Sequence, residues 1–150
     1  MEYRRQTHAV FYIRYHLVIS TKFRRKLFKG GIGRYLTVLV RSIQRQHPEI
    51  EILEVNTDLD HVHILLSVAP KVSISQAVGV IKANTARMLK HKFPFLVAGY
   101  FDTDTIWSIG YFVSTVGINE QAIKKYIDLQ GKEDSGQAKL VFRDATGGSP

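Results

Sequence analysis

Alternating hydrophobic and polar positions predict four β-strands in this chain. Successive side chains of a strand point to opposite faces, and β-branched and aromatic residues favour strands. Runs with both properties cover residues 9–20, 49–58, 61–69 and 105–116. In the third run one face carries Val62, Ile64, Leu66 and Val68, and the other carries His61, His63, Leu65 and Ser67. That strand therefore has an apolar face and a face that bears two imidazoles.

Hydrophobic residues at helical spacing predict three helices. The first follows Gly33 and carries an apolar stripe from Tyr35 to Ile43. The second covers residues 73–91, for which Ser73 is a suitable N-cap. The third covers residues 118–130 and is entered through Gly117.

The resulting order, β-α-β-β-α-β-α, predicts an α+β protein with a ferredoxin-like, RRM-like split βαββαβ antiparallel sheet and an added C-terminal helix. In this architecture the first and third strands are central, and two helices cover one face of the sheet. His61 and His63 would then stand on the open face, which RNA-recognition folds use for nucleic acid. We expect one domain over residues 1–131 and a loose, glycine-rich tail over residues 132–150.

The composition limits which side chains could bind a metal and where in the cell we expect the protein. The chain has no cysteine, so a metal would have to be held by histidine, carboxylate or amide groups. No apolar run reaches the roughly 20 residues that a membrane span needs, and the first residues do not resemble a signal peptide. We therefore expect a cytoplasmic protein that does not enter a membrane.

Positive charge is concentrated in the N-terminal third of the chain. The net charge is +8, and residues 1–48 contain eleven Lys and Arg against a single acid, Glu2. The densest segment is "TKFRRKLFK", which supplies Lys22, Arg24, Arg25 and Lys26. Such a cluster favours binding to phosphate backbones, and its phenylalanines could stack on bases. A solvated basic turn is the simpler alternative.

Two groups of residues are candidates for a metal-binding or catalytic role. Histidines at i and i+2 of a strand lie roughly 7 Å apart and can converge on one cation, although each could instead be a half-buried residue bonded to its neighbours. On the last helix, Tyr126 and Gln130 share the face that docks on the body. Tyrosine at such a position is usually a core residue, whereas packing explains Gln130 less easily.

The segments "YHLVISTKFRR", "DHVHILLS", "WSIGYFVSTVG" and "YIDLQ" together resemble the single-tyrosine transposases of small insertion sequences, which belong to the HUH endonucleases. The resemblance covers residues 9–131. It implies that His61, His63 and Gln130 bind Mg²⁺ or Mn²⁺ and that Tyr126 is the nucleophile. It also implies that the tyrosine helix swings on Gly117, and that a homodimer shares its active sites between subunits.

The activity implied by this resemblance is cleavage and rejoining of single-stranded DNA at insertion-sequence ends through a 5′-phosphotyrosine, with recognition of DNA hairpins by the basic cluster. A non-catalytic ferredoxin-like nucleic-acid-binding protein is an alternative, as is a domesticated relative that no longer moves. A histidine-triad hydrolase would need a third alternating histidine, where this chain has Leu65.

Overall fold

The computed structural model describes residues 3–6, 9–97, 105–115 and 120–136. Their regular elements, in chain order, are β1 (Arg4–Gln6), β2 (Ala9–Phe11), β3 (Tyr15–Ser20), the 3₁₀ turn η1 (Lys22–Arg24), α1 (Gly31–Gln46), β4 (Ile50–Thr57), β5 (His61–Val68), α2 (Ile74–Lys92), the 3₁₀ turn η2 (Pro94–Leu96), β6 (Phe112–Ser114) and α3 (Glu120–Asp134). None of the helices in these residues is long and apolar enough to cross a membrane.

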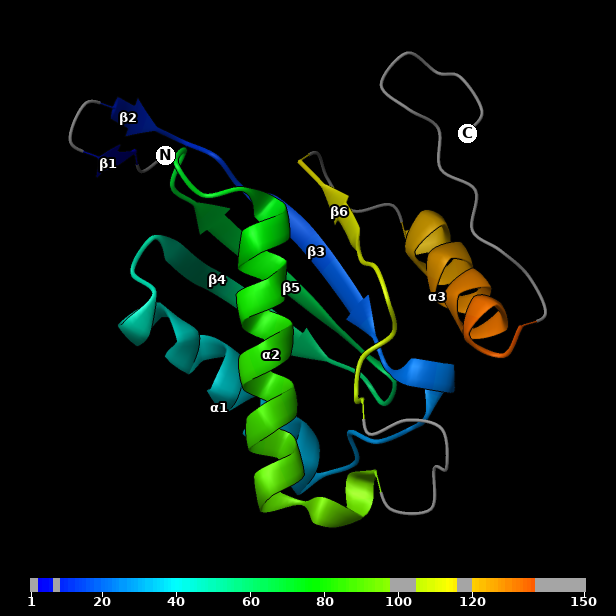
Figure 1. Ribbon diagram of the computed structural model, residues 1–150. Helices are drawn as coiled ribbons and strands as arrows, with labels where there is room; N and C mark the ends of the chain where they lie inside the picture. Colours follow the sequence, from blue (N-terminus) through cyan, green and yellow to red (C-terminus); the bar gives the residue numbers. More distant parts are fainter. Residues whose placement is uncertain (1–2, 7–8, 98–104, 116–119, 137–150) are drawn as a thin grey trace.

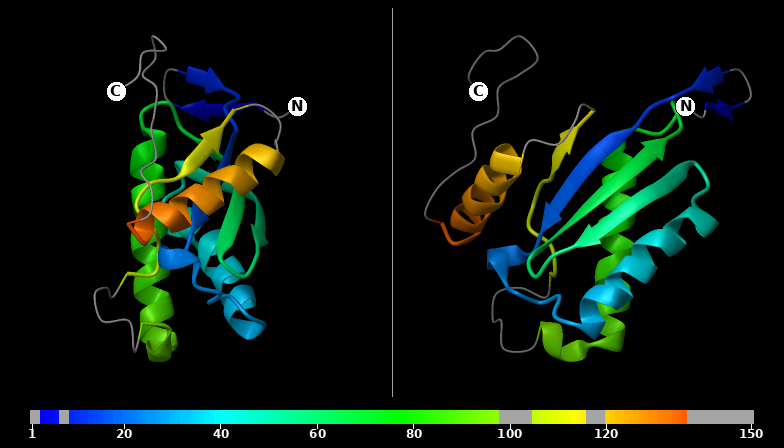
Figure 2. Two further views of the ribbon diagram at one scale, coloured as in Figure 1. Left: turned by 90° about the vertical axis from the view of Figure 1, so that its right-hand side faces the viewer. Right: turned by 180° about the vertical axis from the view of Figure 1, so that it is seen from behind.

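The main sheet confirms the predicted fold class. Its strands run in the order β4-β5-β3-β6, and every neighbouring pair is antiparallel. The first and third predicted strands, now β3 and β5, are central, as expected. Helices α1 and α2 cover one face, and the strands lie in front of them when the molecule is seen from behind (Figure 2). Helix α3 stands apart from these two helices, beside β6 (Figure 1).

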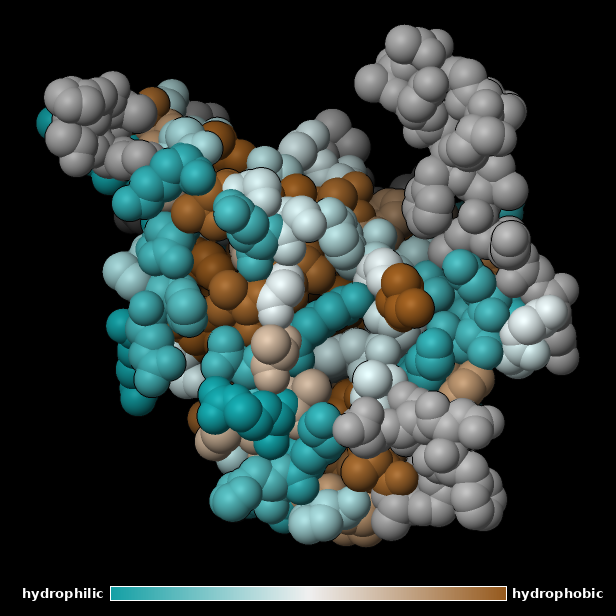
Figure 3. Space-filling model, in the orientation of Figure 1, coloured by the Kyte–Doolittle hydropathy of each residue, from teal (hydrophilic) through white to brown (hydrophobic). Residues whose placement is uncertain are grey.

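The core lies between the sheet and the helix pair. Leu17 of β3 and Ile64 and Leu66 of β5 are fully buried there, together with Leu36 of α1 and Ile81 of α2. Burying such a side chain contributes roughly 1.5–3 kcal/mol. On the outside of this helical layer, hydrophobic side chains gather along one flank of α2 and hydrophilic ones lie over α1 (Figure 3).

The predicted cap of α2 is confirmed. The Ser73 hydroxyl accepts a hydrogen bond from the Gln76 backbone N–H at 3.0 Å, and the Gln76 side chain accepts one from the Ser73 N–H at 3.0 Å. These bonds satisfy two backbone donors that a helix start otherwise leaves open.

Two predicted strands are shorter than the sequence pattern indicated. The run over residues 9–20 divides into β2, which pairs with β1 in a separate two-stranded sheet, and β3, which joins the main sheet. The described part of the other run, residues 105–115, contributes only β6 and one bridge between Thr21 and Trp107. Gly110, between these two pairings, has a φ of +91°, which takes the chain out of strand geometry.

The last helix is longer at its C-terminal end than predicted. It continues to Asp134, whose carboxylate accepts a hydrogen bond from the backbone N–H of Phe23 at 3.0 Å. Asp134 also contacts Ser108 Oγ and lies 3.6 Å from the Lys22 ammonium. These partners are remote in sequence, so the helical pattern alone gave no sign of them.

Candidate functional site

The predicted histidine pair lies on the face of the sheet opposite α1 and α2. His63 pairs with Val18 of β3, and His61 pairs with Ser20. Paired residues of an antiparallel sheet share a face, so these four side chains form one outer surface. Between the two histidines, Val62 points the other way and is fully buried. The alternation read from the sequence is therefore confirmed here.

A third imidazole, which the sequence did not single out, holds His63. His16 Nδ1 lies 3.3 Å from His63 Nε2, and the two rings stack with centroids 5.4 Å apart and planes 7° apart. One ring nitrogen of His63 is thus engaged by a protein partner, as is usual for metal-binding histidines. Burial lowers the pKa of His63 below 6.5, and the nearby His16 lowers it further. His63 is therefore neutral at pH 7, the form that can bind a cation.

Asp60 holds the other histidine. Its Oδ1 accepts a hydrogen bond from His61 Nδ1 at 2.9 Å. This bond lowers the pKa of Asp60 despite the opposing effect of burial, and nearby Arg24 lowers it further. The remaining nitrogen of His61, Nε2, lies 3.9 Å from an oxygen of Asp58. Each predicted metal ligand on β5 therefore has one ring nitrogen held by a neighbouring side chain.

Tyr126 and Gln130 meet on the buried face of α3, as the helical spacing predicted. Their exposed fractions are only 8% and 1%. The Tyr126 ring packs against Val18 and Phe112. Neither the Tyr126 hydroxyl nor Gln130 Oε1 has a hydrogen-bond partner among the described residues. Both atoms lie beside Gly110, where an added Cβ would be 3.8 Å from the hydroxyl and 3.6 Å from Oε1.

The surroundings of Tyr126 keep its phenol protonated in this position. Burial raises the pKa of Tyr126 above its usual value of 10, and the negative charges of Asp134 and Glu133 raise it further. A neutral phenol is a weak nucleophile. Tyr126 would therefore need help from its surroundings to attack a phosphate.

The start of β5 and the adjacent face of α3 border one hollow of about 420 Å³. Its lining consists of Arg24, Asp58, Asp60, His61, Ile123, Lys124, Ile127 and Asp128. His61 thus faces the tyrosine helix across this space, while the Tyr126 ring points to Val18 and Phe112. Among the described residues, no group of three or more His, Cys, Asp or Glu side chains could hold a metal. A cation bound through His61 and His63 would need another kind of donor, and the buried, unpartnered oxygen of Gln130 fits that requirement in chemical type.

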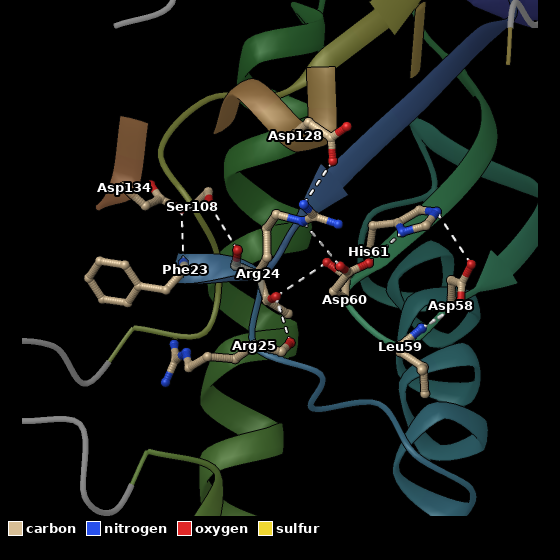
Figure 4. Close-up of polar contacts among 11 residues, drawn as sticks. Phe23, Arg24, Arg25, Asp58, Leu59, Asp60, His61, Ser108, Asp128 and Asp134 are labelled. Carbon is tan, nitrogen blue, oxygen red and sulfur yellow. Dashed lines mark hydrogen bonds and ion pairs between the residues drawn. The ribbon is translucent and has the colours of Figure 1, made fainter. Parts of the chain in front are cut away.

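The basic cluster does not present all its cations to solvent. Lys26 is exposed, and Lys22 lies near Asp134. Arg25 is buried, and its guanidinium donates to the backbone oxygens of Lys22 and Thr105. Arg24 lies between two carboxylates, as Figure 4 shows. Gly117, the predicted pivot of the tyrosine helix, lies outside the described residues.

Comparison with known proteins identifies the family to which this chain is similar. Residues 9–130 match the family described as "Transposase IS200 like". The chain is 35% identical over 127 residues to the transposase for insertion sequence element IS200 of Salmonella typhimurium, covering 85% of this chain and 82% of that protein. It is 31% identical over 122 residues to the ISDra2 transposase TnpA of Deinococcus radiodurans, covering 81% of this chain and 86% of that protein.

A solved structure agrees with these matches. The crystal structure of a proposed transposase from Deinococcus radiodurans R1 aligns with a TM-score of 0.76 and 28% identity, covering 85% of this chain and 97% of that one. The chain belongs to the IS200-like transposase family, and the resemblance found in the sequence is confirmed. This membership makes it a DNA-processing enzyme of mobile elements and implies a divalent metal.

Proposed function

We propose that this member of the IS200-like family cleaves and rejoins single-stranded DNA at insertion-sequence ends through a 5′-phosphotyrosine at Tyr126. One observation carries the proposal. The outer face of the sheet holds His61 and His63, and α3 packs on that same side with the Tyr126 hydroxyl and Gln130 Oε1 buried and without partners. Burying a polar atom without a hydrogen bond costs roughly 1–3 kcal/mol, so such atoms are often kept for function.

His61, His63 and Gln130 would hold a Mg²⁺ or Mn²⁺ ion. All three donors are neutral, so the bound ion would keep its full charge to polarise the phosphate and stabilise the departing oxygen. His63 suits this role because its lowered pKa leaves the ring unprotonated at neutral pH. The hydrogen bonds that join His61 to Asp60 and His63 to His16 would fix the two rings.

Tyr126 would supply the nucleophile from α3, which packs on the same side of the sheet as the two histidines. Its oxygen attacks the phosphorus, a new O–P bond forms, and the bond from phosphorus to the 3′-oxygen breaks. The phenol loses its proton, and the departing 3′-oxygen ends as a free hydroxyl. Attack by another 3′-hydroxyl on the phosphotyrosine reverses these changes and joins the strands, so no external energy source is needed.

The exposed part of the basic cluster would hold the DNA. We propose that the turn carrying the predicted DNA-binding set, Lys22, Arg24, Arg25 and Lys26, grips a hairpin near the element's end, with the lysines making the phosphate contacts. Lys26 and Arg24 are the exposed members, and Arg24 is held between two carboxylates, so Lys26 is best placed for direct phosphate contact. Arg25 would act by supporting the turn, since its guanidinium is bonded to backbone oxygens.

We also propose a homodimer with active sites shared between subunits. The test is to mix Tyr126→Phe chains with His63→Ala chains, each inactive alone. Restored cleavage in the mixture would mean that one chain's tyrosine serves the other's histidines. No restoration, with mixed dimers shown to form, would place both parts of each site in a single chain.

The activity itself is tested with end-labelled single strands from the chain's own element, incubated with and without Mn²⁺. The expected product is a Mn²⁺-dependent protein–DNA species that survives denaturation and carries the label downstream of the cut. If the protein binds these strands in a salt-dependent way but never forms that species, the non-catalytic nucleic-acid-binding alternative replaces this proposal.

A further inference from the structure

One arginine joins the three parts of the proposed site. Arg24 Nη1 lies 2.7 Å from Asp128 Oδ1 on α3, and its Nε lies 3.5 Å from Asp60 Oδ2. Asp60 in turn holds His61 at 2.9 Å. Figure 4 shows this continuous path from the tyrosine helix through the basic turn to the histidine strand.

The backbone that presents Arg24 is held in an uncommon conformation. Phe23 has a φ of 60° and Arg24 a φ of 53°, in the left-handed region that residues other than glycine rarely occupy. Hydrogen bonds fix the turn: the Arg24 N–H donates to Thr21 O at 3.1 Å, and the Thr21 hydroxyl donates to Arg25 O at 2.8 Å. Such strain persists where the surrounding structure enforces it, commonly near functional sites.

Helix α3 is shaped to receive this side chain. Gly131 lies directly under the stem of Arg24, and a Cβ added there would be 2.3 Å from Arg24 Cδ and 2.6 Å from Cγ. A larger residue would displace the arginine from its place between the carboxylates. Gly131 follows Gln130 directly in the chain, so this close approach lies beside the proposed third metal ligand.

We propose that Arg24 is a positioning residue that sets α3 against the histidine strand, through Asp128 on one side and Asp60 on the other. This inference rests on the proposed function, and it gives Arg24 a role that differs from simple phosphate contact. Losing the bridge lets α3, and with it Tyr126 and Gln130, shift relative to His61. Small displacements of this kind can cost on the order of a hundredfold in rate.

The test separates positioning from DNA binding in the full-length protein. Arg24→Gln, Arg24→Lys and Asp128→Asn are each compared with Arg41→Gln, which removes an exposed positive charge on α1. Single-turnover formation of the covalent species is measured at saturating DNA, and DNA affinity is measured separately in EDTA. We expect the first three variants to slow the reaction about tenfold or more, with affinity little changed, and Arg41→Gln to react like the parent protein.

Asp128→Asn is the sharpest of these variants. It removes a negative charge, so a phosphate-binding role for Arg24 predicts equal or tighter DNA binding and an unchanged rate. Arg24→Lys separates the roles in the same way, because lysine keeps the charge but lacks the fork that spans two carboxylates. If Arg24→Gln weakens DNA binding while the rate at saturating DNA is unchanged, the proposal is wrong.

Hydrogen exchange of the α3 amides, measured without DNA, tests independently of activity whether Arg24 positions this helix. Arg24→Gln and Gly131→Ala should both increase exchange in α3, while exchange in α1 and α2 stays at the parent level. Unchanged exchange in α3 would overturn the proposal. If the parent protein forms no covalent species, the proposed function fails, and the exchange data still report whether Arg24 fixes the helix.

Discussion

The two faces of the sheet are covered by helices that are held in different ways. Helices α1 and α2 pack on fully buried apolar side chains, such as Leu17, Ile64 and Leu66. Helix α3 rests on a small group centred on Val18, Tyr126 and Ile127, together with polar contacts made by Asp128 and Asp134. Elements with few apolar contacts open more readily than the core. The inner face therefore carries most of the apolar packing, whereas α3 on the outer face is held by fewer apolar contacts and by polar ones.

The two sides of the sheet also differ in their buried polar atoms. Ser20 Oγ, the Tyr126 hydroxyl and Gln130 Oε1 are buried without hydrogen-bond partners among the described residues, and all three belong to the outer side of the sheet or to α3. Folding alone does not favour such atoms, because each loses its hydrogen bonds to water. The Tyr126 hydroxyl and Gln130 Oε1 are both atoms of the proposed active site, which gives a reason for their lack of partners.

Two adjacent residues of β5, His63 and Ile64, point to opposite faces of the sheet, so variants at these positions test the difference between the faces. His63→Ala, on the outer face, should abolish metal-dependent cleavage because it removes a proposed ligand. It should change the free energy of unfolding by less than about 1 kcal/mol, since it leaves the core intact. Cleavage assays and urea unfolding of the same preparation check both points. Cleavage at the parent rate would remove His63 from the metal site.

Ile64→Ala, on the inner face, should have the opposite profile. The side chain is fully buried in the core, so truncation should lower the free energy of unfolding by about 2–5 kcal/mol. The folded fraction should still bind Mn²⁺ with the parent affinity, as measured by titration calorimetry at low temperature. Equal destabilisation by His63→Ala would contradict the division between the faces.

His16→Phe tests whether the contact between His16 and His63 supports metal binding, and it leaves the proposed ligands unchanged. Phenylalanine keeps the ring stacked on His63 but cannot hydrogen-bond to its Nε2. Loss of such a supporting bond typically weakens metal binding about 10–100-fold. Titration with Mn²⁺ should show this change, and Tyr12→Phe, which alters an aromatic residue nearer the N-terminus, serves as its control. An unchanged affinity would mean that the contact is incidental.

The smallest predicted effect is the pH dependence of the contribution that Lys82 makes to the free energy of unfolding. Its ammonium donates to the backbone oxygens of Ser108 and Gly110 at 2.8 and 2.6 Å, and burial lowers its pKa from 10.5 to about 8. Between pH 8 and 10.5 the unfolded chain binds more protons at this group than the folded chain does, so its contribution to stability rises with pH.

Comparing the parent protein with Lys82→Met in urea across this range isolates the group from other titrations. The difference in unfolding free energy, parent minus variant, should increase from pH 8 upward. A difference that is independent of pH would show that the pKa of Lys82 is not depressed.

Local patterns were sufficient to predict much of this molecule. Alternation placed His61 and His63 on the open face, and Ser73, ahead of residues at helical spacing, gave the start of α2. Both features depend on residues a few positions apart, whose geometry regular structure determines. The family motifs then connected these histidines with Tyr126 and Gln130.

Features that depend on distant partners were not predictable in this way. Arg25 belongs to a charged segment that suggested full exposure, yet it is buried against the Thr105 backbone. Arg24 acquires its neighbours only when α3 and the start of β5 come together. His16 is one polar residue within an apolar strand, and only the strand register places it beside His63.

The central claim is that the Tyr126 oxygen attacks the DNA, and Tyr126→Phe tests it most directly. This change removes one unpartnered hydroxyl and keeps the ring that packs on Val18 and Phe112, so folding and DNA affinity should be preserved. With Mn²⁺ and labelled single strands, the account predicts that the parent protein forms a denaturation-resistant species whose DNA mass maps to Tyr126, and that Tyr126→Phe forms none. A covalent species that persists in Tyr126→Phe would contradict it.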